Sequence, residues 1–108
     1  MKKTNVIQGG IYQYAQETGF SFDEILNGTT KEQQACRSAY YLMLRRAEYT
    51  YEQIALICGR FIASIHRSVI SAEKSLEKGD PKFIKFYKIA KNIGVKKNEI
   101  INPLLVTE

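Results

Sequence analysis

The chain has 108 residues, of which 44% are hydrophobic and 25% charged, and it carries 16 lysines and arginines against 11 acidic residues. These values are those of a single globular domain with one core, and they exclude a disordered or fibrous chain. No apolar run approaches the roughly 18 residues of a membrane span, and no apolar segment follows the lysines at the start, so we expect neither a membrane anchor nor a signal peptide. We expect a cytoplasmic protein in which Cys36 and Cys58 are buried free thiols, with no metal or other cofactor.

Every boundary signal along the chain is that of a helix, and no segment alternates with the period of a strand. We therefore predict an all-α fold of five to seven helices in a single domain, residues 1–108. The helices of the first half are expected over residues 11–18, 22–27 and 31–47, with stops at Gly19 and Gly28 and caps at Ser21 and Thr30.

The second half of the chain contains three further helix signals. They begin at the capping residues Thr50 and Asp80 and at about Ile62, and they end at Gly59, Gly79 and Gly94. The inward faces predicted from helical spacing are Ile62, Ile65, Val69, Ala72 and Leu76 in one helix and Phe83, Phe86, Tyr87, Ala90 and Ile93 in the last.

Three residues between Thr50 and Leu76 have the spacing of a helix-turn-helix. Ala55 is small enough to let a second helix approach, and Gly59, four residues later, can take the left-handed turn conformation. Ile65, six residues further on, is a β-branched residue that can pack back against the first helix. We therefore predict a helix-turn-helix at the centre of the fold.

Basic residues are concentrated in one part of the sequence. Between Lys31 and Lys97 there are 14 basic and six acidic residues, a net charge of +8, whereas the remainder has a net charge of −3. This charge favours a polyanionic partner, because cations that neutralise phosphates release counterions. Two explanations, solubility or a secondary contact with DNA or RNA, stay open for the stripe of Lys82, Lys85, Lys88 and Lys91.

A series of motifs runs from the first predicted helix to the turn. In chain order they are Tyr14–Phe20 with Glu24–Leu26, Arg37 and Arg45 around Tyr40–Leu42, Thr50–Ala55, and Gly59–Ile65. In this order they resemble the C-terminal DNA-binding domain of the bacterial replication initiator DnaA. The resemblance implies that residues 11–78 form a helix-turn-helix domain of the Trp-repressor-like class that binds duplex DNA, with residues 79–108 as a helical extension.

The chain departs from that family at the start of the second helix of the motif. Phe61 and Ile62 stand where the family has an Asp-His pair, and Ala63 replaces the first of its two threonines. The chain also has no phosphate-binding loop and no ATPase domain. We therefore expect a free-standing DNA-binding regulator of replication or transcription that does not recognise the initiator's own binding box.

The candidate DNA contacts lie on the outer side of that second helix, which meets base edges near its N-terminal end. Ala63 and Ser64 allow a close approach, and Arg67 can bond guanine O6 and N7 together. Arg60 is expected to take a phosphate or, as the resemblance implies, the edge of the minor groove. The remaining candidates, for the backbone or the flank of the site, are Lys31, Arg37, Arg45, His66, Ser71 and Lys74.

Other functions remain open to different degrees. We expect no enzyme and no small-molecule substrate, because no carboxylate pair, Cys-His pair or phosphate loop has a catalytic spacing. The alternative is a protein-interaction module that keeps the helix-turn-helix framework, which exposed side chains at Phe61 and Ile62 would favour. Arg37 has a purely local alternative, a pair with Glu32 or Gln33 on its own helix. A protein partner or a homodimer is possible, and residues 79–108 are where a dimer contact would be sought.

Overall fold

The structure of the chain is a computed structural model that describes residues 11–93. Within that range it contains helices and no strand, so the predicted all-α class is confirmed. A helical segment at residues 11–18 is followed by α2 (Phe22–Asn27), α3 (Lys31–Arg46), α4 (Tyr51–Cys58), α5 (Ile62–Lys78) and α6 (Pro81–Ile93). The predicted end of the last helix at Gly94 lies outside the described residues.

Polar caps explain where most of these helices begin. The cap side chain accepts a hydrogen bond from the backbone of the third helical residue, whose own side chain returns to the cap backbone. This reciprocal pair is formed by Ser21 with Glu24, Thr30 with Gln33 and Thr50 with Gln53. The α6 start uses Asp80, whose carboxylate accepts a hydrogen bond from the Lys82 backbone N–H at 3.2 Å.

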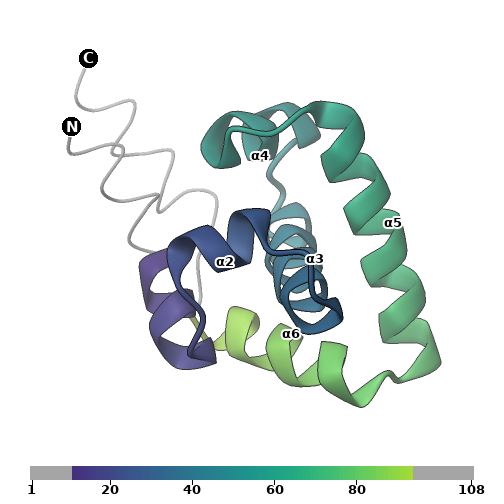
Figure 1. The fold of residues 1–108 in the computed structure, drawn as a ribbon. Helices are drawn as coiled ribbons and strands as arrows, with labels where there is room; N and C mark the ends of the chain where they lie inside the picture. The colour runs from purple at the N-terminus through teal and green to yellow at the C-terminus, as the bar shows by residue number, and fades with distance from the viewer. Residues whose placement is uncertain (1–10, 94–108) are drawn as a thin grey trace.

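α3 is the central helix, and it contacts each of the four helices that follow or precede it. Figure 1 shows α5 running along one side of α3 and α6 passing beneath it, with α2 and α4 near its two ends. α3 can pack against helices on several sides because most residues in its middle are apolar and buried. These are Cys36, Ala39, Tyr40, Tyr41, Leu42, Met43 and Leu44.

A single cluster of buried side chains joins all of these helices. In it, the Tyr14 ring stacks on Tyr40 with centroids 5.4 Å apart, and the Tyr14 hydroxyl donates to the Cys36 carbonyl at 2.7 Å. α6, expected as an extension, contributes Phe83 and Phe86 to this same cluster. The C-terminal helix therefore packs into the core that supports α5.

Both cysteines are buried free thiols, as predicted. Burial raises the pKa of the Cys36 thiol, and it raises the pKa of Cys58 to about 12. A thiol with so high a pKa stays protonated near neutral pH and is a poor nucleophile.

No helix described between residues 11 and 93 is long and apolar enough to cross a bilayer by itself. α4 and α5 satisfy the length and composition criteria only as a pair, and that pair is bent by 109°.

Candidate nucleic-acid interface

The link between α4 and α5 is a three-residue turn, Gly59–Arg60–Phe61, at which the helix direction changes by 109°. Gly59 has φ +65° in the left-handed region, as predicted, so a residue with a side chain would be strained there. The Arg60 backbone N–H then donates to the Ala55 carbonyl at 3.0 Å, which closes the end of α4. Ala55 and Ile65 are buried as predicted, and α4 and α5 contact each other.

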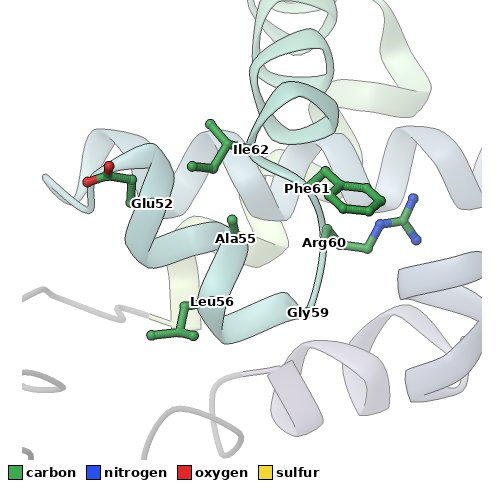
Figure 2. A pocket seen from close by; sticks show the side chains of 7 residues that line it. All are labelled: Glu52, Ala55, Leu56, Gly59, Arg60, Phe61 and Ile62. Atoms are coloured by element: carbon green, nitrogen blue, oxygen red, sulfur yellow. The ribbon is translucent and has the colours of Figure 1, made fainter.

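Ile62 is where the predicted inward face of α5 is wrong. Its side chain is 43% exposed, whereas Ile65 and Val69 are buried. Ile62 belongs to the first turn of α5, and Figure 2 shows its side chain lying on the α4 side of the turn. Phe61, whose orientation the sequence left open, is 84% exposed.

A polar groove of about 260 Å³ runs between α3 and α5. Its walls carry three guanidinium groups, together with hydroxyl and amide side chains, and no carboxylate. The lining residues, which we call the polar groove, are Gln34, Arg37 and Ser38 of α3, Arg60 of the turn, and Ser64, Arg67, Ser68 and Ser71 of α5.

Arg37 is held at the C-terminal end of α2. Its Nη1 donates to the Gly28 carbonyl at 2.9 Å and to the Ile25 and Leu26 carbonyls at 3.4 Å each. These oxygens belong to the end of α2 that carries partial negative charge, so a cation is favourable there. The pairing with Glu32 or Gln33 that the sequence left open is wrong within residues 11–93, because Glu32 pairs with Lys82 at 3.9 Å and Gln33 closes the α3 capping box.

Arg60 reaches the same end of α2 from the turn. Its Nη1 donates to the Leu26 carbonyl at 2.7 Å and to Asn27 Oδ1 at 3.0 Å. Burial lowers the pKa of Arg37, and the positive charge of Arg60 lowers it further. Two like charges are therefore held close together, and each guanidinium retains N–H donors beyond the nitrogen that binds α2.

Several of the residues predicted to contact DNA are exposed on the outer face of α5. Ala63, Arg67 and Lys74 follow one another at steps of four and seven residues, which places them on one side of the helix. Arg67 and Lys74 form no hydrogen bond or ion pair with any residue from 11 to 93. Ser71 is exposed beside them, Ser64 is half-buried in the polar groove, and Lys31 is exposed at the start of α3.

Two further predicted contacts, Arg45 and His66, pack on one tyrosine, Tyr51. The His66 ring stacks on the Tyr51 ring with centroids 3.7 Å apart, and the Arg45 guanidinium carbon lies 4.6 Å from the centroid of the Tyr51 ring. Arg45 also donates to the Tyr49 carbonyl at 3.1 Å. These contacts join α3, α4 and α5, and neither residue lines the polar groove.

An apolar pocket of about 410 Å³ lies on the opposite side of the turn, between α4 and α5 (Figure 2). Leu56 in its wall is 85% exposed, and Ile70, further along α5, is 48% exposed. Sequence reasoning missed both, although helical spacing places Ile70 outside the inward face formed by Ile65, Val69 and Ala72. The lining residues, which we call the apolar pocket, are Glu52, Ala55, Leu56, Gly59, Arg60, Phe61 and Ile62.

The part of the chain that the structure describes contains no group of three His, Cys, Asp or Glu side chains able to hold a metal ion. Comparison of the chain with protein-family models, with characterised proteins and with solved structures found no match.

Proposed function

We propose that the protein binds duplex DNA, with α4, the turn and α5 acting as a helix-turn-helix. The observation that carries the proposal is the polar groove, which gathers Arg37, Arg60 and Arg67 beside α5 without a carboxylate. Such a surface suits a phosphate backbone, because three cations from α3, the turn and α5 lie together in the groove and no acid in its lining neutralises them. The role that follows is that of a regulator of replication or transcription.

The shape of the turn supports the same proposal. Helix-turn-helix pairs are joined by three or four residues, often including glycine, at about 90–120°. Here a turn of three residues that contains Gly59 separates two helices bent by 109°. The order of motifs over residues 11–78, which resembles the DNA-binding domain of DnaA, belongs to this proposal as well.

Each basic residue has a distinct part in the proposed complex. Arg67 and Lys74 on the outer face of α5 would enter the major groove, with Arg67 bonding a guanine and Lys74 a phosphate. Arg37 and Arg60 would use the donors that α2 does not occupy to bind phosphates, which would also relieve the repulsion between them. Lys31 extends the same basic side from the start of α3.

The test is fluorescence anisotropy with a mixed-sequence duplex across a salt series. We expect the double variant Arg67→Ala, Lys74→Ala to bind less tightly, with a log–log salt slope shallower by about 1, since the one phosphate contact that it removes, that of Lys74, contributes about 0.9. The matched control removes two exposed lysines of α6, Lys85→Ala with Lys88→Ala, and should leave the slope unchanged. Absence of binding by the folded protein at low salt would overturn the proposal.

A second candidate function is a protein-interaction module. The exposure of Leu56 and Phe61 in the apolar pocket favours it, since large apolar side chains gathered at a surface commonly mark a binding site. The same anisotropy experiment separates the two functions, because a protein-interaction module has no affinity for the duplex at any salt concentration.

A further inference from the structure

The outer face of α5 combines exposed apolar side chains with exposed basic ones. Ala63 and Ile70 are both exposed and lie seven residues, or two turns, apart on the side that also presents Arg67. Phe61, directly before the helix, is 84% exposed (Figure 2). Apolar side chains therefore lie next to Arg67 among those that would first meet a base edge.

The major groove offers few surfaces that an apolar side chain can contact favourably. Its floor consists of hydrogen-bond donors and acceptors, with the C5 methyl group of thymine as the apolar exception. An apolar side chain over a polar base edge displaces water without replacing its hydrogen bonds, and this is unfavourable. The same side chain over a methyl group buries apolar surface on both partners.

On the basis of the proposed DNA binding, we infer that α5 reads pyrimidine C5 methyl groups through Phe61, Ala63 and Ile70. Charge complementarity argues that the occupant of this face is DNA. Arg67 and Lys74 lie among the apolar residues and make no ion pair with residues 11–93. A partner for the whole face must therefore combine negative charge with isolated apolar groups, as thymine-containing duplex does.

The test compares duplexes that differ only in the methyl group. Alternating dA-dT duplex is compared with alternating dA-dU, in which the methyl is replaced by hydrogen. We expect the dA-dU duplex to bind about 3- to 10-fold more weakly, which corresponds to one or two buried methyl groups. The same comparison between alternating dG-dC and its 5-methylcytosine form tells whether the methyl is read on any pyrimidine or only in a T·A pair.

Variants test whether the preference for the methylated duplex depends on the apolar residues of α5 and the turn. The double change Phe61→Ser, Ile70→Gln should bring the ratio of dA-dT to dA-dU affinity close to one, with affinity for dA-dU retained. Both residues are exposed, so the fold should persist, as thermal melting by circular dichroism will show. Leu56→Gln is the matched control, an exposed apolar residue on α4 whose side chain points away from Phe61 in Figure 2, and it should leave the ratio unchanged.

The outcomes that oppose the inference are distinct from those that oppose DNA binding. Equal binding of dA-dT and dA-dU would overturn methyl reading and leave the proposed function intact. A ratio lowered as much by Leu56→Gln as by the α5 double change would also overturn the inference. No binding to any of these duplexes would overturn the proposed function itself and would direct attention to a protein partner.

Discussion

The two sides of the N-terminal part of α5 have opposite chemistry. Towards α3 lies the polar groove with its three arginines, and towards α4 lies the apolar pocket with Leu56 and Phe61 at the surface. A cationic groove attracts any phosphate backbone, whatever its sequence. Apolar groups bind only where a partner presents apolar surface. The polar groove is therefore a source of affinity, and the apolar side chains are a source of selectivity.

The two sides also differ in what they contribute to the fold. Arg37 and Arg60 in the polar groove bond the carbonyls that end α2, and they fix α2 against α3 and the turn. Leu56 and Phe61 are almost fully exposed and make little contact with the core. Changes at Arg37 or Arg60 should therefore alter stability and binding together, whereas loss of the Leu56 or Phe61 side chain should remove little packing from the core.

The largest expected effect is a loss of folding stability at alkaline pH, caused by the buried thiol of Cys58 at the end of α4. Because it acts on the whole fold, it should weaken both sides of α5 together. Burial raises the pKa of this thiol from its ordinary value near 9 to about 12. An unfolded chain then loses the proton first, so the contribution to stability is full below about pH 9 and is lost as the pH rises towards 12. We expect the free energy of unfolding to fall by about 1 kcal/mol per pH unit in that window.

Urea unfolding at a series of pH values between neutral and strongly alkaline measures this loss. Burial also raises the pKa of Tyr40 and Tyr41, so these residues act in the same direction. The Cys58→Ala variant should therefore show a shallower, though not flat, dependence on pH. An identical slope in the variant and the natural chain would show that Cys58 does not contribute.

Within the polar groove, Arg37→Ala should destabilise the fold by about 1–3 kcal/mol, because it leaves the Ile25 and Gly28 carbonyls at the end of α2 without a charged donor. Chemical denaturation measures the change. Arg67→Ala removes the same charge from the same groove at an exposed position, and it should change stability by no more than about 0.5 kcal/mol. Equal effects of the two variants would remove the distinction between an arginine that holds α2 and one that is available to a ligand.

At the start of α5, Phe61→Ser should stabilise the protein by about 0.5–1 kcal/mol while it weakens binding. Phe61 is the N-cap of α5 and provides no side-chain hydrogen bond, whereas the caps of α2, α3 and α4 do. A serine hydroxyl at this position can accept from a free backbone N–H of the first turn. Phe61→Ala, which lacks the hydroxyl, should give no gain in melting temperature, and a loss in both variants would mean that the phenyl ring supports the turn.

Local features of this fold could be predicted from the sequence because short-range chemistry determines them. The caps at Thr30 and Thr50 and the left-handed glycine at Gly59 all lie where the spacing of cap, apolar and glycine residues placed them. The inward faces of α5 and α6 followed from helical periodicity alone, except at Ile62. Ile62 lies in the first turn of α5, before the first buried position, Ile65. Periodicity predicts which side of a helix faces the core, but it does not predict how far along the helix the neighbouring helices cover that side.

The candidate site was less accessible to sequence reasoning, because its residues meet only in three dimensions. Arg37 and Arg60 share the end of α2, and a partner more than 30 positions away, such as Leu26 for Arg60, has no local signal. His66 and Arg45, which the sequence predicts as DNA contacts, both pack on Tyr51, and no local pattern signals that contact. Charge and polarity identify candidates, and the packing of the helices decides which of them stay available.

The smallest expected effect is that of Leu56→Gln, and it tests whether the two sides of α5 are independent. Leu56 is 85% exposed, so the change should alter the free energy of unfolding by less than about 0.5 kcal/mol. Because Leu56 lies on α4, away from the polar groove and the outer face of α5, affinity for duplex DNA should not change either. A clear loss of DNA affinity with unchanged stability would mean that DNA, or the chain bound to it, covers the apolar pocket as well. The two sides would then form one continuous interface, with charge and apolar contact contributed by both flanks of the same helix.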